Sequence, residues 1–535
     1  MFSDASRQVK SENRNVTRAA GVVGAATLLS RIFGYVRDMV LASFFGAGMT
    51  TDAFIAAFRI PNLLRRLFGE GSLSIAFVPV FTETLLKGSR EEGLRLAASA
   101  LKLLLVFLSV ITVIGVVAAP LIIQAVAPGF STLPEKMALT VTLTRIMFPY
   151  TILIGLVALC MGILNALGHF AAPAIAPVLL NLAMIGAVFA VSRFSDSETV
   201  QVIGLASGVL LGGVLQLALQ LPYLVKHGVR FWVRSGLWHP AMKKVGFLML
   251  PTIFGAAVYQ INILVGTLLA SLLPEGSVSY LYYADRLVQF PLGIFAQAAA
   301  TAVLPSLSRQ AASSDQAGMG DTFGHAMSLV LFITIPAMVG LIVLREPIVA
   351  LLFKRGAFDA RTTRLTSDAL LYYAVGLWAF SAVRIVVSMF YAMQDTRTPV
   401  KTATIAIAAN IFFGMALMGP MKHCGLALAT SLASMVNLAL LVVVLKNKLG
   451  VIRWRPIFSS CLKTLAASGL MALGVVMTSG ILIPPENESG SLRLLAGIGA
   501  GIIGGVLIFS VAAWKLKIPE WQNVMALMRR SLNRS

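Results

Sequence analysis

The sequence predicts an all-α polytopic membrane protein of about 14 transmembrane helices, with two six-helix lobes of pseudo-twofold symmetry and two further C-terminal helices. Three observations lead to this prediction. Of the 535 residues, 58% are hydrophobic and 12% charged, with a mean hydropathy of +0.85, whereas soluble domains carry about a quarter charged residues. Apolar runs long enough to cross a bilayer follow one another between short polar breaks. Prolines recur at a nearly constant spacing.

The apolar runs set the positions of the predicted spans. The first contains Arg31 and Arg37, and no small-residue cleavage site follows it closely, so it is interpreted as a permanent span and not as a signal peptide. The predicted spans are 19–45, 52–84, 96–126, 137–167, 171–192, 200–225, 243–273, 277–308, 322–348, 365–393, 399–420, 424–446, 460–483 and 492–514.

The proline spacing indicates an internal repeat. Pro79 and Pro305 are 226 residues apart, as are Pro173 and Pro399, and 230 residues separate Pro61 from Pro291. This offset equals about six spans, and an even-numbered repeat keeps its orientation in the membrane, so the two lobes are related by an axis along the membrane normal. Two lobes around one central site are typical of a transporter, and the prolines should bend spans 2 and 8.

The distribution of basic residues orients the chain and divides it. Lys and Arg gather at both termini and in alternate loops, with an exception between Arg345 and Arg364, so both termini are expected in the cytoplasm. The predicted divisions are a cytoplasmic N-terminal segment (1–18), an N-lobe (19–225), a cytoplasmic linker (226–242), a C-lobe (243–446), a lipid-tail region (447–514) and a cytoplasmic tail (515–535).

Arginines inside the predicted spans are the candidate functional residues. Each costs about 2.5 to 3.5 kcal/mol at the centre of a membrane helix. Arg31, Arg37, Arg65 and Arg286 are therefore expected to line a water-filled cavity. The planar guanidinium group matches the oxygens of phosphate or diphosphate, so an anionic cargo is expected. For Arg59, Arg66, Arg145 and Arg384, snorkelling or structural pairing is the favoured interpretation. The alternative for Arg37 and Arg286 is a structural pair with the neighbouring Asp38 and Asp285.

No pattern of catalysis or metal binding stands out. Cys160, Cys424 and Cys461 lack paired spacing, and the five histidines have no zinc-binding pattern. We therefore expect no enzymatic activity, no cofactor and no metal. The net charge of +21 is largely explained by cytoplasmic loops, so nucleic acid is not an expected partner.

Several motifs resemble the MurJ (MviN) family of lipid II flippases, within the multidrug/oligosaccharidyl-lipid/polysaccharide (MOP) exporter superfamily. The most specific motifs run from Ser30 to Asp38 (SRIFGYVRD), Phe45 to Phe54 (FGAGMTTDAF) and Pro61 to Gly71 (PNLLRRLFGEG). Further matches are YYADRL from Tyr282, LPSL from Leu304 and QDTRTP from Gln394, so the resemblance extends over most of the chain.

The resemblance implies a set of cavity residues. The four arginines Arg31, Arg37, Arg65 and Arg286 would bind the cargo, with Ser30, Asp52 and Glu70 as nearby polar partners. Two positions depart from the family pattern. Gln289 stands where many members carry Glu, and the segment 262–266 lacks the acidic sodium-binding residue of some members, so sodium coupling is not predicted.

The expected function is to flip lipid II, the undecaprenyl-diphosphate-linked peptidoglycan precursor, from the inner to the outer leaflet of the bacterial cytoplasmic membrane by alternating access. Membrane lipids and cell-wall synthesis or division proteins are the other expected partners of a monomer, and the two C-terminal spans are expected to hold the lipid tail. Three alternatives stay open: a flippase for another lipid-linked oligosaccharide, a cation-coupled multidrug antiporter, and an inactive scaffold of cell-wall assembly.

Overall fold

The computed structural model describes residues 2–69, 72–229, 236–450, 452–482 and 491–532. Within these ranges every regular element is a helix. Nine helical stretches of the described residues are long and apolar enough to cross a membrane, or ten if the two helices at 360–375 and 377–392, bent by 41° at their junction, form one span. The prediction of an all-α polytopic membrane protein is therefore confirmed. The count of fourteen spans stays a prediction.

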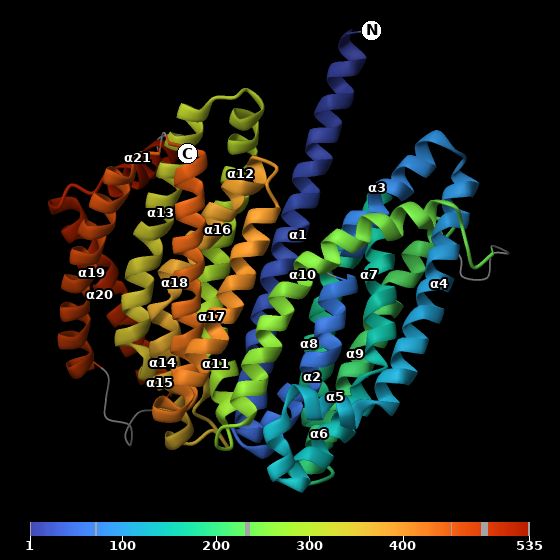
Figure 1. Ribbon diagram of the computed structural model, residues 1–535, viewed down its shortest axis with the longest axis horizontal. Coiled ribbons are helices and arrows are strands. Elements are labelled where there is room, and N and C mark those ends of the chain that lie inside the picture. The colour runs from blue at the N-terminus through green and yellow to red at the C-terminus, as the bar shows by residue number, and fades with distance from the viewer. Residues whose placement is uncertain (1, 70–71, 230–235, 451, 483–490, 533–535) are drawn as a thin grey trace. The chain divides into compact units, whose positions relative to one another are not determined.

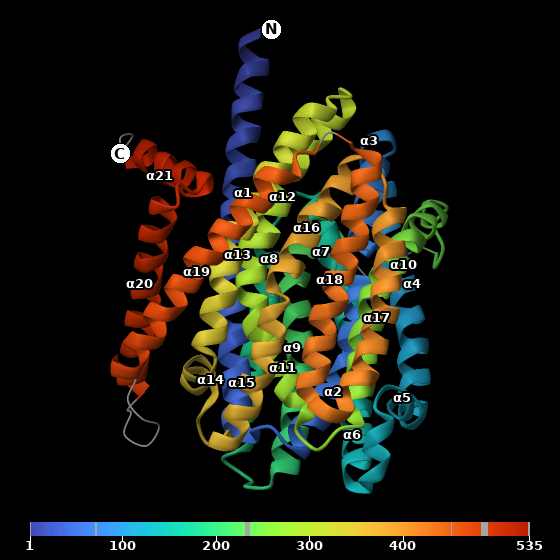
Figure 2. The ribbon, with the colours of Figure 1, turned by 60° about the vertical axis from the view of Figure 1, so that its left-hand side comes forward.

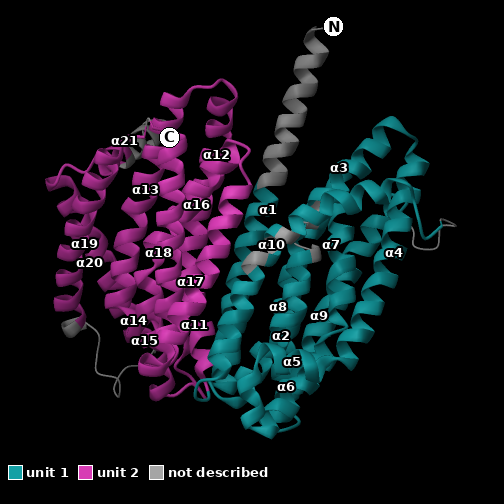
Figure 3. Ribbon diagram, viewed as in Figure 1, with its two compact units in different colours: residues 1–275 teal, residues 276–535 magenta. Residues whose placement is uncertain are grey.

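The chain divides into two compact units, residues 1–275 and 276–535 (Figure 3). Unit 1 contains the elements from α1 to α10, whose α-helices are labelled in Figure 1. They are α1 (Phe2–Phe45), α2 (Met49–Leu64), the π-helix η1 (Arg65–Gly69), α3 (Ser72–Lys87), α4 (Arg90–Val117), α5 (Ala119–Val126), the 3₁₀ helix η2 (Pro128–Thr132), α6 (Pro134–Met147), α7 (Tyr150–Ala166), α8 (Ala171–Val191), α9 (Glu198–Lys226) and α10 (Ala241–Ser271).

Unit 2 contains the remaining elements, and their order parallels that of unit 1. They are α11 (Ser277–Pro291), the π-helix η3 (Leu292–Ala296), α12 (Gln297–Ala312), α13 (Gln316–Val343), α14 (Arg345–Phe353), α15 (Ala360–Val375), α16 (Leu377–Ala392), α17 (Arg397–Met421), α18 (His423–Lys448), α19 (Trp454–Leu482), α20 (Ser491–Lys515) and α21 (Pro519–Leu532).

The element order confirms the internal repeat that the prolines predict. The series from α2 to α9 is matched by the series from α11 to α18, and each series holds a π-helix after its first α-helix. Pro61 lies in the last turn of α2, four residues before η1, and Pro291 ends α11 directly before η3. Because proline removes a backbone donor and crowds the preceding turn, the helical register shifts there and a π turn follows.

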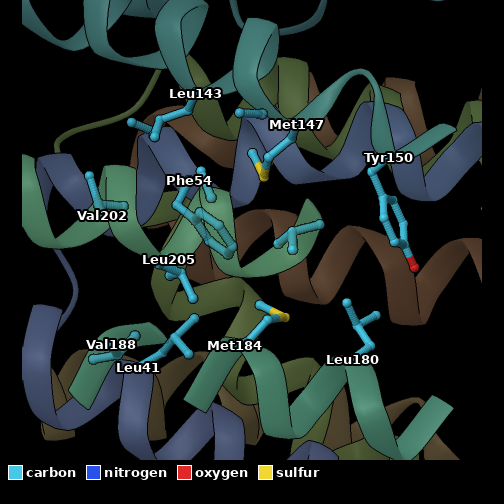
Figure 4. Packing of buried hydrophobic residues seen from close by; sticks show 14 of the residues in the cluster. Leu41, Phe54, Leu143, Met147, Tyr150, Leu180, Met184, Val188, Val202 and Leu205 are labelled. Carbon is cyan, nitrogen blue, oxygen red and sulfur yellow. The ribbon is translucent and has the colours of Figure 1, made fainter. Parts of the chain in front are cut away.

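The core of unit 1 joins six helices. Figure 4 shows large apolar side chains from α1, α2, α6, α7, α8 and α9 meeting in one cluster. On α9, the glycines Gly204, Gly208 and Gly212 recur every four residues and face α8, where an added Cβ would lie within 2.7 Å of a side-chain atom of that helix. This small-residue stripe lets the two backbones approach closely, as is common between membrane helices.

The helix α10 lies in unit 1, although the span at this position is predicted to belong to the C-lobe. The predicted C-lobe begins with the span at 243–273, but α10 belongs to unit 1 and packs against α3. Lys244 of α10 donates a hydrogen bond of 2.6 Å to Glu83 of α3. How the lobes move in transport stays a prediction.

After the repeat, unit 2 continues with the two long helices α19 and α20 and the shorter α21. The helices α19 and α20 pack against each other, and α19 also packs against α13 (Figure 2). Their shared core includes Phe332, Met471 and Phe509. Many other apolar side chains of α19 and α20, such as Leu473 and Ile503, are exposed, as expected for helices that face lipid.

Candidate functional site

The described candidate residues lie on three helices and one π turn. Ser30, Arg31 and Arg37 lie on α1, Asp52 lies in the first turn of α2, and Arg65 begins η1, all in unit 1. Arg286 lies on α11 of unit 2. The seventh candidate, Glu70, lies outside the described residues.

Arg37 is buried between α1 and α8, with 6% of its surface exposed. Its Nη2 and Nε atoms donate to Oδ1 of Asp38, at 2.6 and 3.0 Å, and Asp38 is fully buried. Its Nη1 atom donates to Oδ1 of Asn181 on α8, at 3.1 Å. The charge of Arg37 is thus balanced by the carboxylate of the adjacent Asp38, the structural pair that was the alternative interpretation, and its place in a water-filled cavity stays a prediction.

Arg31 and Ser30 differ from Arg37 in exposure. The Arg31 side chain is exposed and that of Ser30 is half-buried. The backbone carbonyl of Ser30 accepts a hydrogen bond of 3.3 Å from Nδ2 of Asn181. Arg31 is therefore the candidate on α1 whose guanidinium group is accessible.

Asp52 forms a buried ion pair that the sequence did not predict. Nζ of Lys136 on α6 lies 2.7 Å from Oδ2 of Asp52, and the two residues are 3% and 1% exposed. The same ammonium group lies 4.2 Å from the ring centroid of Phe130. Because a buried charge needs a partner, this pair links α2 to α6, and Asp52 is already engaged by a cation of its own unit.

Arg65 and Arg59 bring positive charge to the end of α2 and the start of η1. Arg65 is half-buried, and its Nε donates to Oδ1 of Asn62 at 2.8 Å. Arg59 donates from Nη1 to Oγ1 of Thr267 and, at 3.5 Å, to the carbonyl of Ile263, both on α10. Arg59 therefore connects two helices of unit 1, as the structural-pairing interpretation expects.

Unit 2 carries a second set of polar side chains beside its own π turn. The guanidinium carbon of Arg286 lies 5.7 Å from the ring centroid of Tyr282, one turn earlier on α11. Asp285 accepts a hydrogen bond of 3.4 Å from Gln289. Gln297, the first residue of α12, accepts a hydrogen bond from Nη1 of Arg384 on α16. Arginines thus lie close to the equivalent π-helices of both repeats.

Two residues of these networks were missed by the sequence analysis. Asn181 is a single polar residue in a long apolar run, and that isolation is a signal that could have been read. Lys136 gives no such signal, because it lies in a polar stretch before an apolar run and looks like an ordinary loop lysine. Only the packing of α6 against α2 shows that it is buried.

The fold of this chain is similar to that of solved membrane transporters. The structure entitled "Lipid II flippase MurJ, inward closed conformation" superposes with a TM-score of 0.76 at 28% identity, over 92% of this chain and 99% of that one. An inward-facing multidrug resistance MATE family transporter of the MOP superfamily superposes with a TM-score of 0.67 at 16% identity, over 82% of this chain and 99% of that one. At such low identity the second likeness concerns the fold alone.

These likenesses define the class: the chain has the fold of the MOP superfamily of membrane transporters. A sequence model described as lipid II flippase MurJ matches residues 41–485. A probable lipid II flippase MurJ of Vibrio cholerae is 40% identical over 436 residues, which are 80% of this chain and 82% of that protein. The chain belongs to the lipid II flippase MurJ family.

Proposed function

We propose that this protein moves lipid II from the inner to the outer leaflet of the bacterial cytoplasmic membrane. The observation that carries the proposal is the family match over residues 41–485, which includes every described candidate residue from Asp52 onward. The chain also covers most of the length of the relatives that bear the name. The family is one of transporters, and we propose no enzymatic step.

The cargo's diphosphate is proposed to bind the accessible arginines. Arg31 is exposed, and Arg65 and Arg286 are half-buried. A guanidinium group can donate two parallel hydrogen bonds to phosphate oxygens, and these charge-assisted bonds are about twice as strong as neutral ones. Arg31, Arg65 and Arg286 therefore form the proposed anion-binding set, with Ser30 beside it on α1.

Arg37 and Asp52 are proposed to have a structural role while their buried pairs are intact, instead of binding cargo directly. Both are buried, and each has a partner of opposite charge in its own unit, Asp38 and Lys136 respectively. Breaking such a pair is costly because it leaves an uncompensated buried charge. We propose that Arg37 and Asp52 keep α1 and α2 in place during transport, and that Arg37 reaches cargo only in a state where its contact with α8 opens.

Alternating access is proposed to expose the site first to one leaflet and then to the other. With both termini in the cytoplasm and the cell interior negative, outward movement of an anionic head group is favoured by about 2.3 kcal/mol per charge per 100 mV. The undecaprenyl tail would remain in lipid, along the exposed apolar surface of α19 and α20. No second subunit is needed for this scheme.

Depletion of this protein in a bacterium that depends on it for growth tests the proposal. Loss of the protein should raise the fraction of lipid II in the inner leaflet, measured by accessibility to an externally added lipid II-cleaving enzyme. The wild-type gene should restore growth, whereas Arg31→Ala and Arg286→Ala should not. Arg193→Ala is the matched control, because Arg193 is exposed in the connection between α8 and α9.

Two outcomes would contradict the proposal. If depletion leaves the distribution of lipid II unchanged, the protein does not move lipid II. If Arg31→Ala and Arg286→Ala restore growth as well as Arg193→Ala does, the arginines do not bind cargo, and a scaffold role explains the requirement for the protein.

A further inference from the structure

Asn181 of α8 lies between two functional positions of α1. Its Oδ1 accepts from Nη1 of Arg37 at 3.1 Å, and its Nδ2 donates to the backbone carbonyl of Ser30 at 3.3 Å. Nδ2 also lies 3.4 Å from the carbonyl of Pro177 on its own helix. The residue is 6% exposed. One side chain therefore joins α8 to two positions of α1 that are two turns apart.

Only an asparagine-like group fits these partners. The carbonyl half of the amide faces a donor, the guanidinium group of Arg37, and the amino half faces two carbonyl oxygens. Turning the amide over would place donor against donor and acceptor against acceptor. A leucine of similar volume would provide neither half, and an aspartate would lose the donor to Ser30.

The Asn181 contacts fix the rotation of α1 about its axis. Ser30 and Arg37 are seven residues apart, so they lie on the same face of the helix, two turns from each other. Gly34 lies between them, and a Cβ added there would have Nδ2 of Asn181 as its nearest neighbour, at 3.8 Å. With this face turned to α8, Arg31 lies about 100° further round the helix. Its side chain is exposed.

We propose that Asn181 is a positioning residue for transport, which sets the rotation of α1 so that Arg37 is held against α8 and Arg31 is presented to cargo. The consequence for transport rests on the proposed function. The rotation of α1 does not, because it can be measured without any cargo.

Chemical modification of arginines tests the rotation. The full-length protein in nanodiscs is treated with phenylglyoxal, which reacts with accessible guanidinium groups, and each site is quantified by peptide mass spectrometry. In Asn181→Leu, modification of Arg37 should rise several-fold and that of Arg31 should fall several-fold, both relative to the exposed Arg145 as internal reference. Unchanged reactivity of both arginines would overturn the proposal.

A matched control separates this effect from the general cost of removing a membrane asparagine. Asn410 is also 6% exposed and lies on α17, the helix that corresponds to α8 in the repeat. Asn410→Leu should leave the reactivity of Arg31 and Arg37 as in the wild type. If Asn181→Leu does not fold, Asn181→Ser, which keeps a smaller polar group, takes its place with the same expected directions.

Binding of purified lipid II to the nanodisc-embedded protein tests the functional consequence. Asn181→Leu should weaken binding about tenfold if Arg31 then faces the cargo about a tenth of the time, because apparent affinity falls with the population of the competent orientation. In an Arg31→Ala background the same substitution should change binding less than about twofold, because interacting sites are not additive. A purely structural role would give equal losses in both backgrounds and would overturn the proposal. If the wild type binds no lipid II, the proposed function fails, and the phenylglyoxal result still decides the role of Asn181.

Discussion

Replacing one partner of the buried Asp52–Lys136 pair should destabilise the protein far more than replacing both. The relevant substitutions are Asp52→Asn, Lys136→Met and the double variant. Each single substitution leaves the opposite charge buried between α2 and α6, where the two residues are 1% and 3% exposed. The double variant removes both charges and keeps similar side-chain volumes.

The expected loss of unfolding free energy follows from the distance between the two charged groups and from the burial of both side chains. Unit charges 2.7 Å apart attract each other by about 6 kcal/mol at an effective dielectric constant of about 20. Most of this attraction offsets the loss of hydration of the two groups, so the pair adds little net stability. Removing one partner leaves that loss uncompensated and should cost about 3 to 5 kcal/mol, whereas the double variant should lie within about 1 kcal/mol of the wild type or above it.

Reversible unfolding in mixed micelles, with a rising fraction of denaturing detergent and detection by circular dichroism, measures these free energies. Because the double variant should lie close to the wild type, the coupling energy from the double-mutant cycle should be close to the sum of the two single-variant losses. Single variants that lose less than about 1 kcal/mol would refute the reasoning, because surface pairs are worth only that much. A transport assay of the double variant gives a second test. If Asp52 acts only through Lys136, the double variant should still move lipid II. If Asp52 binds cargo, the double variant should not move lipid II.

Three further predictions concern packing and pH. Gly425→Ala should destabilise the α17–α18 hairpin, because the new Cβ would lie 2.3 Å from a backbone oxygen of α17. Gly419→Ala in the same hairpin should not, because its new Cβ would meet nothing within 4 Å. The melting temperatures of the two variants test this difference. Gly208→Leu should lower the yield of folded protein on size-exclusion chromatography by forcing α9 away from α8. Burial opposes ionisation of Asp395, but the hydrogen bonds from Lys448 and Thr398 outweigh it and lower the pKa of this carboxyl below 3.8. The stabilisation by ionised Asp395 is therefore complete above that value and is lost as the pH falls through the lowered pKa; the melting temperature of Asp395→Asn should thus depend less on pH in this acid range than that of the wild type.

The location of the arginines on their helices could be predicted from the sequence, but their surroundings could not. Charge in an apolar run is visible in the sequence because of its cost, so Arg31, Arg37, Arg65 and Arg286 all stand out. Whether such a charge faces water or a partner depends on the neighbouring helix. Arg37 is buried against α8 and Arg31 is exposed, although six residues separate them on one helix.

The sequence by itself determined the class of the protein, the repeat and the prolines beside which the two π-helices lie. Apolar runs must be helical in a bilayer because unpaired backbone groups are too costly there, and proline disturbs a helix wherever it falls, so these features follow from local chemistry. Only the tertiary structure decided which polar partners from distant parts of the chain the buried charges meet. Lys136 meets Asp52, and Asn181 meets Arg37, across 84 and 144 residues of chain. Such contacts arise from the packing of distant helices, which no local pattern in the sequence specifies.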